Sequence, residues 1–240
     1  MIDYGLLVSL IIAFGGPALL GNWWLVTGRD EPVGFLDVAV GPAFAGLAVG
    51  RLTTLALDDP SSIGSLSDML IIRSGVEFWP GVAAALAVAV VSANLGLVST
   101  SRRICDLAPL AMVGYAGYEV ACIFRDGCFG PDSAVGLSPP GLTTTMLPIG
   151  WFMAAAVTLA AVGVRALATR GHLPIVVVLA GLLAVASARA VGSIWLPHVG
   201  DGPTRQHLTS IGVVAISAMA VVIAVVRPPR REPCGTPTQA

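Results

Sequence analysis

The chain has 240 residues, of which 55% are hydrophobic and only 11% are charged, and its formal net charge is −1. Soluble domains carry roughly 25% charged residues, so a soluble core of this length could not hide so much apolar surface. The mean hydropathy of +0.85 therefore predicts a polytopic integral membrane protein, and the lack of a long basic run argues against a nucleic-acid partner.

Seven apolar segments follow one another along the chain. A membrane-spanning helix needs about 20 mostly apolar residues, and stretches of this kind cover residues 4–27, 33–57, 80–99, 105–124, 143–167, 173–195 and 208–226. The first has neither a basic n-region nor a small-residue cleavage site, so we interpret it as a retained helix. The two long connections, 58–79 and 125–142, are expected to lie in the interface or to re-enter the membrane.

These segments predict an all-α integral membrane protein with about seven transmembrane helices. We expect residues 1–227 to form a single polytopic domain and residues 228–240 to form a short disordered cytoplasmic tail. Basic residues concentrate in cytoplasmic loops, and all 13 here are Arg. One set of loops holds Arg29, Arg102, Arg103, Arg165, Arg170, Arg227, Arg230 and Arg231, and the other holds Arg73, Arg125 and Arg205. The N-terminus is therefore expected outside and the C-terminus in the cytoplasm.

Five ionisable side chains lie within the predicted spans: Asp37, Arg51, Asp106, Glu119 and Arg189. Such groups are costly in lipid and face a bundle interior or a cavity. Asp37 and Asp106 are near helix ends, where solvation by water explains them. Arg51 and Glu119 are deeper, and two interpretations stay open for them: a structural ion pair, or a polar cavity for a charged headgroup.

The cysteines and histidines do not have the spacing of a zinc site, and we expect no metal and no cofactor. The four cysteines, Cys105, Cys122, Cys128 and Cys234, are expected to be free thiols, with a Cys122–Cys128 disulfide as the alternative. Gly46 and Gly50 form a small-x-x-x-small pair that allows another backbone to approach closely.

Several segments, in order, resemble the prolipoprotein diacylglyceryl transferases of bacterial inner membranes. The similar stretches are Tyr4-Gly5-Leu6-Leu7, Gly50-Arg51-Leu52, Arg73 to Val82, Asp106 to Pro109, Gly114 to Gly130, Leu147 to Ala154, Arg189, and Leu208 to Gly212. The resemblance runs from Tyr4 to about Val226. It implies a seven-span fold and a location in the bacterial cytoplasmic membrane.

The chain departs from the family's pattern at Leu147 and Met153, which replace a His and a Glu, and at three further positions. Trp79 stands where the family has its His, Glu119 where it has the Arg of its signature, and Leu196 where it has the second Arg of the sixth-helix motif. A negative charge at Glu119 would repel a lipid phosphate unless a proton or Arg51 neutralised it. These replacements put the family's usual chemistry in doubt.

The resemblance implies transfer of a diacylglyceryl group from phosphatidylglycerol, or another anionic phospholipid, to the cysteine thiol of a lipoprotein precursor. Arg51 and Arg189, with Gly130, are the expected phosphate-binding residues, since Arg binds two phosphate oxygens at once. Tyr4, Asp106 and Glu119 are the candidates for proton transfer or orientation. Two alternatives stay open: a non-catalytic relative that binds phospholipid or precursor, and a small membrane transporter.

Overall fold

A computed structural model describes residues 4–24, 35–58, 60, 76–94, 100–125, 129–139, 143–196, 203–227 and 234. Its helices are α1 (Tyr4–Trp24), α2 (Phe35–Asp58), α4 (Phe78–Asn94), α5 (Thr100–Val120), α6 (Ile149–Thr169), α7 (Pro174–Gly192) and α8 (Arg205–Val226). A 3-10 turn, η2 (Ala121–Phe124), continues α5, and two strands follow it, β1 (Phe129–Leu137) and β2 (Met146–Pro148). The described part of the chain is thus mostly helical.

Six of these helices, all except α4, are long and apolar enough to cross a membrane. Helix α4 is apolar but has only 17 residues. Large apolar side chains lie on the outside of the bundle, including Leu19 on α1, Leu159 on α6 and Ile216 on α8, which are 70 to 80% exposed. Exposed apolar surface on this scale is costly in water and favourable in lipid, so the chain is a multi-pass membrane protein.

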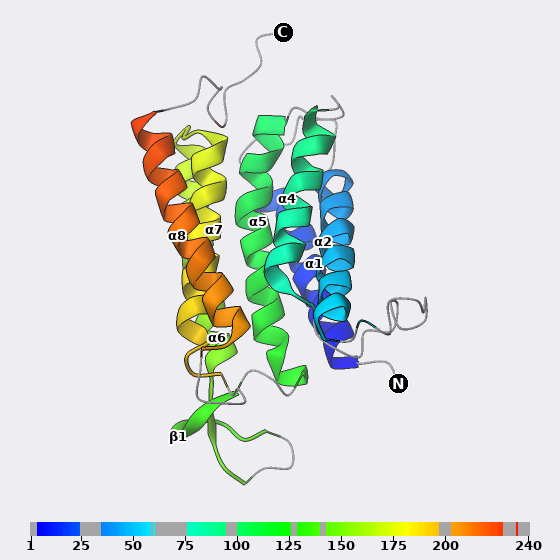
Figure 1. Ribbon diagram of the computed structural model, residues 1–240, viewed down its shortest axis with the longest axis vertical. Helices are drawn as coiled ribbons and strands as arrows, with labels where there is room; N and C mark the ends of the chain where they lie inside the picture. Colours follow the sequence, from blue (N-terminus) through cyan, green and yellow to red (C-terminus); the bar gives the residue numbers. More distant parts are fainter. Residues whose placement is uncertain are drawn as a thin grey trace.

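The segment before α6 departs from the sequence prediction. A helix was expected from Thr143, but residues 146–148 are extended and pair antiparallel with β1, and the helix begins at Ile149. A hydrogen bond from the Ser133 amide to the Thr145 carbonyl, 2.9 Å, extends this pairing. The β1–β2 hairpin lies beyond the lower end of α6 (Figure 1). It therefore caps one end of the bundle.

Helix α5 is central, because it packs against α1, α6 and α7. The buried cluster around it joins Met112 and Tyr115 of α5 to Val157 of α6 and to Val177 and Val185 of α7. Two further pairs of helices, α2 with α4 and α7 with α8, have extensive contacts of their own. In Figure 1 the α2·α4 pair and the α7·α8 pair lie on either side of α5.

Glycines bring α2 and α4 together. A Cβ on Gly81 would lie 2.7 Å from the Gly46 carbonyl oxygen, and one on Gly50 would lie 2.7 Å from the Glu77 carbonyl oxygen. Backbones this close tolerate no side chain at the contact. The expectation that Gly46 and Gly50 permit a close backbone approach is therefore confirmed.

The cysteines differ from expectation. Cys105, at the start of α5, forms a disulfide with Cys234, and Cys122 is also disulfide-bonded. The prediction of free thiols is wrong for these three, because burial brings together side chains that sequence spacing does not relate. The Cys122–Cys128 alternative involves a residue outside the described ones. Cys234 is buried, and its amide donates to the His172 carbonyl oxygen, while the rest of the predicted tail 228–240 is outside the described residues.

Candidate functional site

Arg189 is a buried cation near the end of α7, and it is held by aromatic and acidic partners. Its guanidinium donates from Nη1 to the hydroxyl of Tyr115, 3.0 Å away, and the same nitrogen is 3.6 Å from Glu119 Oε1. The guanidinium carbon lies 4.2 Å from the ring centroid of Phe78. Tyr115 and Glu119 are four residues apart on α5, so they share one helix face. Three helices therefore converge on this guanidinium.

The guanidinium of Arg189 is not fully hydrogen-bonded within the described part of the chain. Its Nε is buried and makes no hydrogen bond within the described part of the chain. The 3.6 Å separation from Glu119 is longer than a hydrogen bond, so this pair interacts mainly by charge. A buried donor without an acceptor costs about 1–3 kcal/mol. Arg189 is therefore placed to accept a further anionic partner.

A polar cavity of about 160 Å³ opens beside Arg189, between the α2·α4 pair and the α7·α8 pair. Its lining combines charged, amide, hydroxyl and indole groups: Thr54, Asp58, Val76, Glu77, Phe78, Trp79, Arg189, Gln206 and Thr209. These residues lie where α2 and α7 end and where α4 and α8 begin. The cavity is thus at the level of the helix ends, where lipid headgroups meet a membrane protein.

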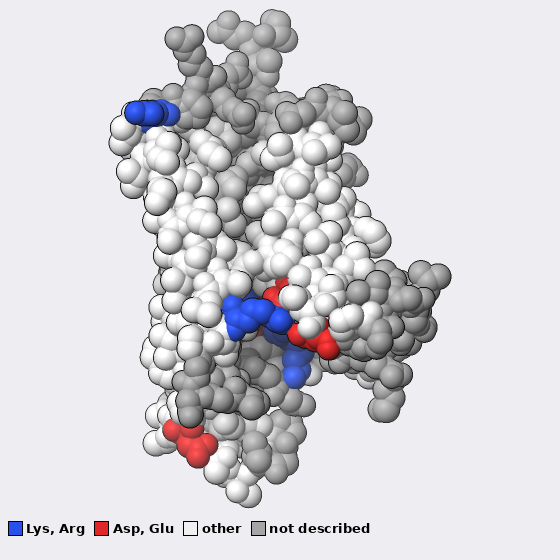
Figure 2. All heavy atoms as spheres, in the orientation of Figure 1, with Lys and Arg blue, Asp and Glu red and all other residues white. Residues whose placement is uncertain are grey.

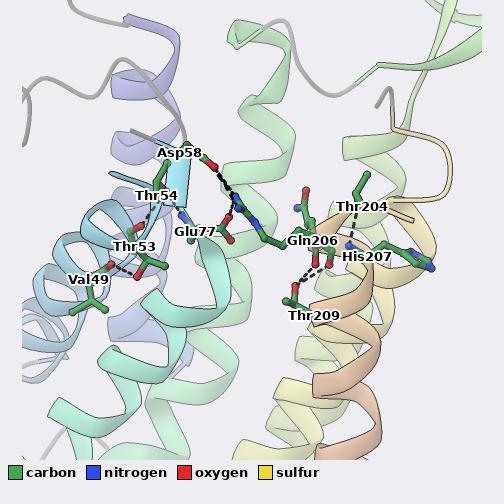
Figure 3. Close-up of polar contacts among 11 residues, drawn as sticks. Val49, Thr53, Thr54, Asp58, Glu77, Thr204, Gln206, His207 and Thr209 are labelled. Carbon is green, nitrogen blue, oxygen red and sulfur yellow. Dashed lines mark hydrogen bonds and ion pairs between the residues drawn. The ribbon is translucent and has the colours of Figure 1, made fainter. Parts of the chain in front are cut away.

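An ion-pair cluster crosses the mouth of this cavity. Arg205, the first residue of α8, contacts Asp58 at the end of α2 and Glu77 just before α4. Figure 3 shows Asp58 and Glu77 pointing toward α8, with dashed lines for these contacts. In Figure 2 the described charges on this face gather in a band between α8 and α2, apart from one basic and one acidic group nearer the ends. The cluster links two helix pairs that otherwise have few contacts with each other.

The position of Glu77 is set by α2. Its amide donates to the Gly50 carbonyl, 3.1 Å, and to the Thr54 hydroxyl, 2.9 Å. Gly50 makes this docking possible, since any side chain there would collide with Val76 and Glu77. Backbone hydrogen bonds to a neighbouring helix fix an otherwise irregular segment at membrane depth. The carboxylate is therefore held at the cavity rather than free in a loop.

Trp79 also lines the cavity and ties α4 to α8. Its indole nitrogen donates to the hydroxyl of Ser210, 3.0 Å away, and its ring meets that of Phe78 edge-on at 4.9 Å. Because this N–H is committed to Ser210, Trp79 offers the cavity a ring face. Trp79, Glu119 and Arg189, three positions singled out by the family resemblance, thus lie in or beside one site.

Other predicted site residues are elsewhere. Tyr4 begins α1 and is exposed, and its neighbour Gly5 packs against the carbonyl of Phe124. Gly130 lies in β1 against Ile149 and the Trp195 carbonyl. Neither Tyr4 nor Gly130 is among the residues that line the cavity.

Asp106 is far from Glu119 on the same helix. The two are 13 positions apart, which is about 20 Å of helix. Asp106 is only 1% exposed, so the expectation that it is solvated at a helix end is wrong. The reason is that α5 lies at the centre of the bundle, where even its first turns are covered by other helices. Asp37 has no described side chain.

Arg51 and Leu196 are not among the residues that line the cavity. Arg51 is buried on α2, one turn before Thr54, and Leu196 follows α7 and is half-buried. Glu119 pairs with Arg189, whereas we expected Glu119 or Asp106 to be the partner of Arg51. Sequence reasoning missed this because it cannot tell which way α2 and α7 turn toward α5.

Several site residues were not predicted. Tyr115 could have been found from its position one turn before Glu119. Asp58, Glu77 and Arg205 were interpreted as loop charges at span ends, and no local pattern indicates that they meet. Their meeting depends on α2, α4 and α8 ending at the same level.

Comparison with known proteins leaves the family open. No protein-family model matches the sequence, and no curated protein matches it significantly.

Proposed function

We propose that this chain is a membrane-embedded protein of the diacylglyceryl-transferase type that binds a phospholipid headgroup in the cavity beside Arg189. The observation that carries the proposal is the buried guanidinium of Arg189, which lines a polar cavity at the level of the helix ends and has one nitrogen with no hydrogen bond among the described residues. Arg is well suited to phosphate, because its planar donors match two phosphate oxygens. The partners are phosphatidylglycerol or another phospholipid and, for transfer, the cysteine of a lipoprotein precursor.

The transfer would proceed by displacement at the lipid's glycerol carbon. The cysteine sulfur forms a bond to that carbon while the carbon–oxygen bond to the phosphate breaks, so the headgroup leaves as a phosphomonoester. The thiol proton passes to a base or to the leaving phosphate. Arg189 would stabilise the charge that develops on the phosphate, and Glu119, the carboxylate paired with Arg189, would accept the proton.

A second candidate, a non-catalytic lipid-binding relative, is favoured by one observation. Trp79 replaces the family's His, and its only N–H is bound to Ser210. An indole cannot act as a base at physiological pH. Proton removal would then depend on Glu119, whose carboxylate is paired with Arg189.

We further propose that all seven helices cross a bacterial cytoplasmic membrane, with the N-terminus outside. Helix α4 would be about 26 Å long at 1.5 Å per residue, close to the thickness of the hydrocarbon core. Helix α1 begins at the lower end of the bundle and α8 ends at its upper end (Figure 1), as an odd number of crossings requires. The Arg distribution supports the orientation.

The test separates binding from turnover. Purified protein should retain phospholipid, and Arg189→Ala should lose it, while Arg227→Ala, at the far end of α8, should retain it. Transfer requires in addition that the retained phospholipid, whether phosphatidylglycerol or another, is consumed when a lipobox peptide with a cysteine is supplied. Retention without consumption would favour the second candidate, and equal retention by Arg189→Ala would reject both.

A further inference from the structure

The ionisable groups at the cavity carry more negative charge than expected for a site that binds a purely anionic headgroup. The lining contains two carboxylates, Asp58 and Glu77, and one guanidinium, Arg189. Their direct ionic partners are Arg205 for the carboxylates and Glu119 for Arg189. Three negative and two positive charges leave this set at −1.

An anionic headgroup would increase that imbalance. Adding a phosphate of charge −1 brings the set to −2, and like charges at short range repel one another. A headgroup that carries its own cation adds no net charge. The balance therefore favours a zwitterionic lipid.

The carboxylates already bind a cation across the cavity mouth. Both nitrogens Nη1 and Nη2 of Arg205 reach Asp58 Oδ1, at 3.3 and 3.2 Å, and Nη2 also contacts Glu77. The Arg205 side chain is 48% exposed, so it can move without leaving a buried charge unpaired. A primary ammonium has three donors and can share the same carboxylate oxygens.

The two ends of the cavity thus differ in sign. Arg189 is the buried cationic group of the lining, whereas the two carboxylates are nearer the surface, with Asp58 exposed and Glu77 partly buried beside α8 (Figure 3). We propose that the cavity selects a phospholipid whose headgroup ends in a primary ammonium, as in phosphatidylethanolamine, with the phosphate on Arg189 and the ammonium on Glu77 and Asp58. This inference rests on the proposed headgroup binding and names the lipid class for that site.

The preference can be measured with short-chain lipids titrated into the full-length protein in a neutral detergent. We expect dihexanoyl-phosphatidylethanolamine to bind on the order of tenfold tighter than dihexanoyl-phosphatidylglycerol, since its ammonium can donate charge-assisted hydrogen bonds to the carboxylates. The choline lipid, whose cation has no N–H, should bind more weakly than the ethanolamine lipid. Glycerophosphoethanolamine should bind more weakly than the lipid; equal affinity would overturn a lipid ligand in favour of a soluble one.

Two variants test the acidic end. Glu77→Gln combined with Asp58→Asn should reduce the preference for the ethanolamine lipid to about onefold, and its thermal unfolding in detergent reports whether it is folded. Arg205→Gln removes the competing cation without touching either carboxylate, so it should strengthen binding of the ethanolamine lipid and weaken binding of the glycerol lipid. The second variant keeps the test decisive if the first does not fold.

The outcomes separate this inference from the proposed function. Tighter binding of the glycerol lipid by the parent, still lost in Arg189→Ala, would overturn the ammonium preference and leave headgroup binding in place. An Arg205→Gln variant with unchanged affinities would also overturn the preference. Binding of neither lipid would reject both proposals.

Discussion

Arg189 on α7 and Glu119 on α5 form a buried ion pair, with 3.6 Å between Nη1 and Oε1 and side chains only 8% and 7% exposed. The two residues are 70 positions apart in the sequence, and their opposite charges compensate each other. Their pairing places a cation at the base of the cavity while keeping the surrounding helix contacts nearly neutral. It also couples the stability of the bundle to the candidate site.

That coupling can be tested by a double-mutant cycle. Arg189→Leu should leave Glu119 buried without its cation and lower the free energy of unfolding by about 3–5 kcal/mol. Arg189→Leu with Glu119→Leu should cost clearly less than the sum of the two single changes. Unfolding of detergent-solubilised protein measures all four variants. Strictly additive losses would show that the two side chains do not stabilise each other.

The hydrogen bond between Trp79 and Ser210 should hold α4 against α8. Trp79→Phe removes the donor and should lower the free energy of unfolding by about 1 kcal/mol beyond the loss of ring area. Ser210→Ala leaves the indole N–H without this acceptor, so the double change should cost little more than either alone. Thr158→Ala is a matched control, because that hydroxyl bonds within its own helix. A Ser210→Ala effect no larger than the control would contradict the contact.

The crossing of α2 and α4 depends on Gly81. Gly81→Ala would place a Cβ 2.7 Å from the Gly46 carbonyl oxygen, which should destabilise the protein by about 1–3 kcal/mol through overpacking. Gly15→Ala, inside α1 with no atom within 4 Å of the added Cβ, should be neutral or stabilising by up to about 1 kcal/mol. Melting temperatures in detergent compare the pair, and equal shifts would show that the crossing is not close-packed.

The disulfides of Cys105 in α5 and Cys122 in η2 should differ in redox state in the cell. The two cysteines are 17 positions apart, or about 25 Å along the helix, so the proposed crossing of α5 puts the two bonds on opposite faces of the membrane whichever way the chain is oriented. Disulfides persist outside the cytosol and are reduced within it. Rapid alkylation of intact cells followed by mass spectrometry should therefore find one bond oxidised and the other reduced. Two oxidised bonds in cells with a reducing cytosol would contradict the spanning arrangement of α5.

The Arg distribution predicts which of the two is reduced. It places the Cys105–Cys234 end in the cytoplasm, so this should be the reduced one. A reporter fused after Ala240 should then be active only in the cytoplasm, and one inserted within residues 58–79 should be active only outside. The reverse reporter pattern, with Cys105–Cys234 oxidised, would invert the orientation.

The apolar segments predicted most of the fold. Lipid requires about 20 apolar residues for each crossing, and this is a local property that can be read along the chain. The helices α1, α2, α7 and α8 accordingly begin and end within a few residues of expectation. The start of α6 was misplaced because residues 146–148 pair with β1, and this pairing depends on a partner strand that the local apolar run does not show.

The sequence by itself also identified the few ionisable side chains that lie within the spans. Such groups need partners, since any ionisable group in a span is costly. Only the tertiary structure decided their partners. A helix face repeats every 3.6 residues, but the rotation of one helix against another is set by packing, here by glycines such as Gly46 and Gly81. Packing pairs Glu119 with Arg189, places Arg205 against Asp58 and Glu77, and buries Asp106 within the bundle. Each of these outcomes depends on contacts between helices that are distant in the chain.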